Sequence, residues 1–291
     1  MNWFENVIYM LQIEMEEPKP WGWFHLMWIF LVVISLIILF CLRNKHSEKQ
    51  LKIVLGTYGI VALGFELIKQ LIWSFNYDSI TGLVTWDYQW YAAPFQLCTT
   101  PIFASIICLF LKENKFRNAL LSYMAYVTIL GSFMTMIIPD SCFVSDTLIN
   151  IHTMWLHCGS FVVSIYLLMS RTVKINKQNL KSAIKVFLIF VLLAEIINIS
   201  IYNLGILGEE TFNMFYISPY FISTLPVFNV IQENVLFIIY LLIYIIAISL
   251  GATIVYCIAY FIKNLKYKKR NMQTIDNKME NKKEENKQWI N

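Results

Sequence analysis

The chain has 291 residues, of which 58% are hydrophobic and only 14% are charged, and its net charge is +4. Soluble domains carry about 25% charged residues and rarely expose a large apolar patch. The composition and a mean hydropathy of +0.57 therefore exclude an ordinary soluble enzyme, a disordered protein and a disulfide-stapled secreted module. They indicate a membrane protein that crosses the bilayer several times.

Seven segments are long and apolar enough to cross a bilayer, which takes about 20 residues of helix. They are Trp23–Leu42, Ile53–Phe75, Ala93–Leu111, Asn118–Ile138, Ile151–Met169, Ala183–Tyr202 and Val235–Ile262. The segment Thr211–Gln232 is also uncharged, but Pro219 and Pro226 favour an interfacial or re-entrant loop that covers the bundle. The sequence predicts an all-α integral membrane protein with a seven-helix bundle.

Charge alternates along the connecting segments. Those after the first, third, fifth and seventh predicted helices are basic, as at Lys49, Arg117, Arg171 and Lys263, and the others are acidic or neutral, as at Asp87. The positive-inside rule places the N-terminus outside and the C-terminus in the cytoplasm. The expected domains are an extracellular N-terminal segment (1–22), a seven-transmembrane-helix domain (23–262) and a basic, disordered cytoplasmic tail (263–291).

Polar residues at membrane depth gather towards the predicted outer side. They are His25, Glu66, Lys69, Gln96, Cys98, His157, Glu195 and Asn198. A charged side chain at the bilayer centre costs roughly 2.5–3.5 kcal/mol on insertion scales, so such groups face the bundle interior or a wet cavity. The pattern predicts a polar pocket that opens near the outer membrane surface.

Each of these residues also has a plainer interpretation. Glu66 and Lys69 lie three residues apart on one helical face, where they can simply neutralise each other. Glu195 lies close enough to an interface to be a structural hydrogen-bonding residue. His25 stands beside Trp21 and Trp23, in a pattern typical of an interfacial belt.

Cys98 and His157 are the pair with the chemistry for catalysis. Counted from the ends of their predicted helices, both lie within about two turns of the outer surface. A histidine that takes the thiol proton makes cysteine a nucleophile, and the electrophile at a lipid interface is an acyl ester. Cys98 can equally be a packing residue or form a disulfide with Cys142. The six cysteines have no metal-ligand spacing, and no metal is expected.

Several short motifs occur in a specific order along the chain. They are Glu66-Leu67-Ile68-Lys69-Gln70-Leu71-Ile72-Trp73, Trp90-Tyr91-Ala92-Ala93-Pro94-Phe95-Gln96-Leu97-Cys98, Ile138-Pro139-Asp140, Met154-Trp155-Leu156-His157, Asn198, and Asn213-Met214-Phe215-Tyr216. This order resembles the YwaF family of bacterial integral membrane proteins. That family is similar to animal transmembrane acyltransferases that use a membrane Cys and His, without acyl-CoA, and more distantly to the androgen-induced lipid-ester hydrolases.

The resemblance implies that Cys98 is the nucleophile and His157 the base, with supporting roles for Glu66, Asn198 and Asn213. It also has departures, because Gln96 stands where the family has a histidine two places before the cysteine. His25 is then a candidate to reach the same pocket in its place.

The resulting hypothesis is an acyl-CoA-independent lipid acyltransferase, or a lipid-ester hydrolase, that acts on phospholipids of the outer leaflet of a bacterial plasma membrane. Gln96, Asn198 or loop amides are the expected donors to the oxyanion. No cofactor and no nucleic-acid partner is expected. Two alternatives stay open. One is a binding or transport protein for a small solute, with Glu66, Lys69 and Glu195 as counter-charges, and the other is a structural membrane partner without a site.

Overall fold

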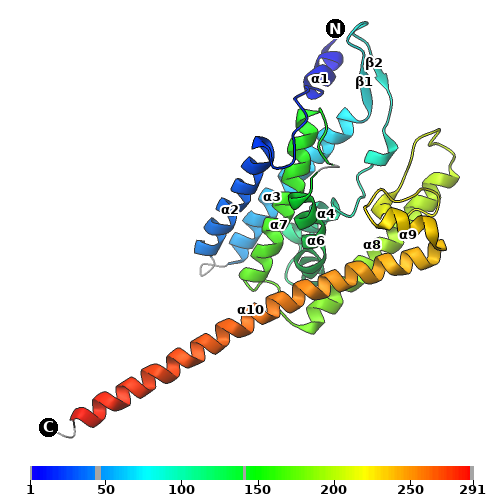
Figure 1. Ribbon diagram of the computed structural model, residues 1–291. Helices are drawn as coiled ribbons and strands as arrows, with labels where there is room; N and C mark the ends of the chain where they lie inside the picture. The colour runs from blue at the N-terminus through cyan, green and yellow to red at the C-terminus, as the bar shows by residue number, and fades with distance from the viewer. Residues whose placement is uncertain (1, 43–46, 140–141, 289–291) are drawn as a thin grey trace.

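The computed structural model describes residues 2–42, 47–139 and 142–288, and it is mostly helical (Figure 1). The helices are α1 (Trp3–Leu11), α2 (Trp23–Leu42), α3 (Glu48–Ile72), α4 (Thr100–Phe110), α5 (Lys115–Tyr123), α6 (Ile129–Ile137), α7 (Thr147–Met169), α8 (Lys177–Asn203), α9 (Phe228–Asn234) and α10 (Phe237–Gln288). The short turns are η2 (Trp90–Ala92), the π-helical η3 (Met124–Thr128) and η4 (Met214–Tyr216). The strands are β1 (Phe75–Tyr77) and β2 (Val84–Trp86).

Six helices of the described chain are long and apolar enough to cross a membrane. They are α2, α3, the continuous segment Lys115–Ile137 formed by α5, η3 and α6, α7, α8, and the part of α10 from Phe237 to Leu265. Each coincides with a predicted span, and α2 has the predicted bounds. The helical multispan architecture expected from composition is therefore confirmed.

The third predicted span differs from the expected continuous helix. Only Thr100–Phe110 is helical, which gives a length of about 16 Å against the roughly 30 Å of the hydrocarbon core. Pro94 and Pro101 explain the difference, because a proline inside a helix lacks the backbone N–H donor and clashes with the preceding turn. Pro101 lies in the first turn of α4, where its missing N–H costs nothing. The chain before α4 is consequently irregular.

A small cap stands at the end of the molecule where the N-terminus lies; it consists of α1, β1 and β2 (Figure 1). Asn2 caps α1 with a reciprocal capping box to Glu5. β1 and β2 pair antiparallel, and the Phe4 ring meets the Phe75 ring edge-on at 5.0 Å. The capping box and these ring contacts give order to a segment that the sequence assigned only to the outside of the bundle.

The bundle is organised around α7, which packs against α2, α3 and α6, while α8 packs against α5. Gly159 lets α7 approach α3 closely, because a Cβ at this position would lie 2.7 Å from the Tyr58 ring. The π-helical η3 lies in the same core. Its Met124 carbonyl accepts hydrogen bonds from Thr128 Oγ1 at 2.9 Å and from Ser164 Oγ at 2.7 Å. Ser164 thus supports the irregular backbone of the neighbouring helix.

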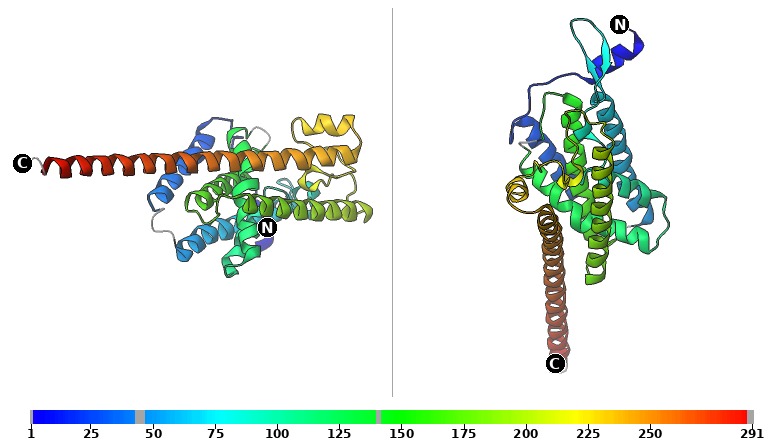
Figure 2. Two further views of the ribbon diagram at one scale, coloured as in Figure 1. Left: turned by 90° about the horizontal axis from the view of Figure 1, so that it is seen from below. Right: turned by 90° about the vertical axis from the view of Figure 1, so that its right-hand side faces the viewer.

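The last helix extends beyond the predicted span Val235–Ile262 into the C-terminal tail. α10 continues without interruption to Gln288 and projects well beyond the bundle (Figures 1 and 2). From residue 263 to residue 288 the chain contains no Gly or Pro and is rich in Lys and Glu, which are good helix formers. Extending an existing helix is far easier than nucleating a new one, so the tail can follow α10.

The segment between α8 and α10 contains no membrane-spanning helix among its described residues, in agreement with the predicted covering loop. It includes η4 and α9. Phe215, Tyr216 and Val227 have positive φ angles of 59°, 61° and 72°. Non-glycine residues in this conformation cost about 1–3 kcal/mol each and persist only where the surroundings hold them in place.

Candidate functional site

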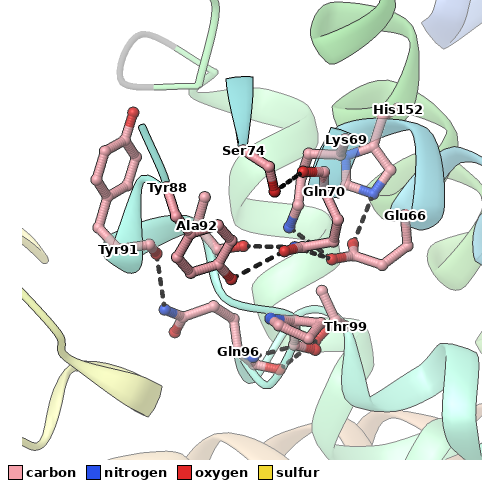
Figure 3. Close-up of polar contacts among 11 residues, drawn as sticks. Glu66, Lys69, Gln70, Ser74, Tyr88, Tyr91, Ala92, Gln96, Thr99 and His152 are labelled. Atoms are coloured by element: carbon pink, nitrogen blue, oxygen red, sulfur yellow. Dashed lines mark hydrogen bonds and ion pairs between the residues drawn. The ribbon is translucent and has the colours of Figure 1, made fainter. Parts of the chain in front are cut away.

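Glu66 is the centre of a buried group of charges between α3 and α7 (Figure 3). Its carboxylate lies 2.7 Å from Lys69 Nζ and 3.1 Å from His152 Nε2. The three side chains are respectively 3%, 12% and 5% exposed. The mutual neutralisation of Glu66 and Lys69, one of the two interpretations of the sequence, is therefore present, and it extends to a histidine on another helix.

Gln70 links this network on α3, by hydrogen bonds, to the chain before α4. Its amide nitrogen donates to Glu66 Oε1 at 3.0 Å and to the Ala92 carbonyl at 2.8 Å. Its amide oxygen accepts from the Tyr88 hydroxyl at 2.9 Å (Figure 3). Burial and the nearby Glu66 carboxylate raise the pKa of Tyr88, so this hydroxyl stays protonated as a donor.

Cys98 lies in the irregular segment directly before α4, next to the N-cap residue Thr99. It is half-buried and forms no disulfide within the described chain, so the pairing with Cys142 allowed by the sequence is not present. Gln70, which bonds Glu66, also bonds the Ala92 carbonyl six residues before Cys98. The segment that contains the cysteine is thus hydrogen-bonded to the buried network.

His157 lies on α7 and is buried, and its Nδ1 has no hydrogen-bond partner among the described residues. His152, one and a half turns earlier, is its electrostatic neighbour. Within the described chain no hydrogen bond joins His157 to Cys98. The pairing of the two residues stays a prediction.

Gln96 and Asn198 both hold the loop that contains η4. Asn198 is fully buried; its Oδ1 accepts from the Met214 N–H at 2.7 Å and its Nδ2 donates to the Met214 carbonyl at 3.1 Å. Gln96 Oε1 accepts from the Phe215 N–H at 3.1 Å. These amides bind the backbone of the η4 loop, and the oxyanion role that sequence reasoning gave them stays a prediction.

Asn213 acts within the same loop. Its side chain accepts from the Ser218 N–H at 2.8 Å and donates to the Phe221 carbonyl at 3.1 Å. The Tyr240 hydroxyl on α10 donates to the Tyr216 carbonyl at 2.5 Å. Asn213 and Tyr240, together with Asn198 and Gln96, hold the backbone around the positive-φ residues Phe215 and Tyr216.

His25 and Glu195 do not join the Glu66 network. His25 Nδ1 accepts from the Trp21 N–H at 2.9 Å, and Nε2 lies 2.7 Å from the Met136 carbonyl, to which it donates. Both ring nitrogens are therefore engaged in fastening the start of α2 to α6, and the substitution of His25 for the family's histidine stays a prediction. Glu195 is half-buried on α8, and its Oε1 has no hydrogen-bond partner among the described residues.

Sequence reasoning missed His152 and Gln70 as members of the site. Gln70 follows Glu66 at the i, i+4 spacing that places two side chains on one helical face, and this spacing was an available signal. The contact of His152 with Glu66 depends on how α7 rotates against α3, which a single sequence does not specify. Asp140, which ends the Ile138-Pro139-Asp140 motif, lies outside the described residues.

The comparisons with known proteins give one result. The family model described as the TMEM164 family matches residues 20–253, which include every helix from α2 to α9 and the first part of α10. No curated protein and no solved structure matches the chain. The match and the six long apolar helices together establish a multi-pass membrane protein. The chain belongs to the TMEM164 family.

Proposed function

We propose that this protein is an acyl-CoA-independent lipid acyltransferase or a lipid-ester hydrolase, with Cys98 as its nucleophile. The position of Cys98 is the observation that carries the proposal. Cys98 is half-buried and lies two residues before Thr100, the first residue of α4. A helix N-terminus stabilises a thiolate, which is the reactive form of cysteine.

The proposed reaction has two steps. The Cys98 sulfur attacks the ester carbonyl of a phospholipid while His157 takes the thiol proton; the carbon–oxygen ester bond then breaks, and the leaving lyso-lipid oxygen receives that proton. A thioester remains on Cys98. In the second step the hydroxyl of another lyso-lipid, or water, attacks the thioester and regenerates the thiol.

The same proposal includes a topology. α4 and the irregular chain before it together make a seventh crossing. Most of the non-helical part is half-buried against the protein, and membrane structures tolerate irregular backbone where protein covers it. Seven crossings place the termini on opposite sides, and the basic connecting segments put the C-terminus in the cytoplasm. Cys98 then faces the outer leaflet. The resemblance to the bacterial YwaF proteins supports a bacterial plasma membrane as the location.

Intact-mass spectrometry of the purified protein after incubation with mixed phospholipids tests the proposal. The wild type is expected to gain a hydroxylamine-labile acyl mass that is lost in Cys98→Ala. His157→Ala should reduce the rate at which this mass forms. Cys257→Ala is the matched control, because Cys257 is exposed on α10 and its removal should leave the adduct in place.

The absence of both an acyl adduct and newly formed lyso-lipid would contradict the proposal. The buried network of Glu66, Lys69 and His152 then favours the second candidate, a protein that binds or transports a small solute. This candidate predicts the opposite ranking of variants: Cys98→Ala keeps function, whereas Glu66→Gln and Lys69→Met lose it.

A further inference from the structure

Tyr244 is a fully buried phenol on α10 with an unusual hydroxyl. The side chain is 0% exposed. Its ring packs against those of Phe187, Phe228 and Tyr240, with centroid separations of 6.3, 5.4 and 6.4 Å. Among the described residues, however, its hydroxyl has no hydrogen-bond partner. The ring is packed on several sides, but the hydroxyl oxygen forms no hydrogen bond with the described residues.

Two neighbouring tyrosines, Tyr123 and Tyr240, do have partners for their hydroxyls. The Tyr123 hydroxyl lies 2.6 Å from Thr100 Oγ1, which itself donates to the Leu97 carbonyl, so Tyr123 is the donor in this pair. The Tyr240 hydroxyl donates to the Tyr216 carbonyl. A buried hydroxyl without a partner is destabilising, and a phenylalanine would avoid this cost. Packing alone therefore does not explain a tyrosine at position 244.

Tyr244 lies in the same part of the bundle as Cys98. Tyr240, one turn before Tyr244 on α10, donates to the Tyr216 carbonyl, and Gln96, two residues before Cys98, accepts from the Phe215 N–H. Cys98 also packs against the buried cluster that contains Tyr244. The amides of Gln96 and Asn198 already bind the loop backbone, whereas the Tyr244 hydroxyl is uncommitted among the described residues.

We infer that Tyr244 is a catalytic residue that donates a hydrogen bond to the oxyanion formed when Cys98 attacks a lipid ester. The inference rests on the proposed thioester chemistry. The new sulfur–carbon bond displaces the carbonyl π electrons onto oxygen, and the phenol stabilises that charge without giving up its proton. When the intermediate collapses, the double bond re-forms and the lyso-lipid leaves. A rigid, pre-positioned donor is the arrangement that oxyanion stabilisation needs.

The decisive variant is Tyr244→Phe, which removes one oxygen and keeps the ring. Loss of one oxyanion donor is expected to slow Cys98 acylation by phospholipid by roughly 10²–10³-fold. Tyr126→Phe is the matched control. Tyr126 is also fully buried, but its hydroxyl contacts the Lys174 carbonyl at 3.5 Å, near the predicted cytoplasmic side. The rate of Cys98 acylation in Tyr126→Phe should therefore stay within about twofold of the wild-type rate.

Alkylation of Cys98 by a lipid-like iodoacetamide separates an oxyanion role from a structural one. Alkylation displaces iodide and forms no oxyanion, so Tyr244→Phe should alkylate at the wild-type rate while it acylates slowly. The unfolding midpoint of Tyr244→Phe in detergent should be equal to or higher than that of the wild type. Equal losses in alkylation and acylation, or an unchanged acylation rate, would overturn the inference. Absence of any wild-type adduct would instead overturn the proposed function.

Discussion

At the scale of single residues, the most informative feature is a carboxylate shared by two basic partners in a nearly dry environment. Glu66 contacts both Lys69 and His152. Taking such groups out of water is costly, so the cluster contributes little net stability as a whole. Removing one member is far more damaging, because it leaves an uncompensated buried charge.

Replacing Glu66 with Ala should therefore lower the free energy of unfolding by about 3–5 kcal/mol, since the Lys69 ammonium would be left unpaired. The double variant with Lys69→Met should regain much of that loss. Unfolding in mixed detergent micelles measures both effects. Glu209→Ala, at an exposed position, is the control and should change stability by less than about 0.5 kcal/mol. Strictly additive losses for Glu66 and Lys69 would show that the pair is not coupled.

At the scale of elements, the loop around η4 depends on side chains from elsewhere in the fold. Asn198 on α8 satisfies both backbone groups of Met214, and Gln96 binds the next residue, whose φ angle is positive. A loop with this backbone would not be stable without such partners. The Cys98 segment and the covering loop are consequently held together as one unit.

Asn198→Ala should destabilise the protein, because each of the two Met214 backbone groups left without a partner costs about 1–3 kcal/mol. The matched control is Asn203→Ala on the same helix, where the exposed side chain bonds only the Ile199 carbonyl. Limited proteolysis reports the loop directly, and cleavage between residues 204 and 227 should accelerate in the first variant alone. Equal protease resistance in the two variants would show that Asn198 does not hold the loop.

The sequence predicted the long helices well, because hydrophobic length and the flanking charges are local properties. It did not predict the interruption before α4 or the cap hairpin, although Pro94 and Pro101 were signals for the interruption. The candidate site was predicted by residue type and depth. Its connections were not, because the contact of Glu66 with His152 and the use of Asn198 as a backbone clamp depend on helix rotation and on a distant loop.

At the scale of the whole molecule, the two ends of the chain lie far apart, with the cap at one end and the extended part of α10 at the other (Figure 1). In the proposed orientation the cap is outside the cell. A cysteine introduced at Ile80, which is 93% exposed in the cap, should react with a membrane-impermeant maleimide in intact cells. A cysteine at Lys177, at the start of α8, should react only after lysis, and the reverse pattern would contradict the orientation.

The π turn of η3 has a consequence for how one span meets its neighbours. A π turn accommodates one residue more than a regular α-helical turn, and each residue advances a helix by about 100°. The apolar stripe of the span Lys115–Ile137 therefore swings round the axis midway through the bilayer. Before the π turn, α5 packs its apolar stripe against α8. After the π turn, α6 packs its apolar stripe against α7. Deleting one residue within Met124–Thr128 would convert the π turn into a regular α-helical turn. One half of the apolar stripe would then face lipid.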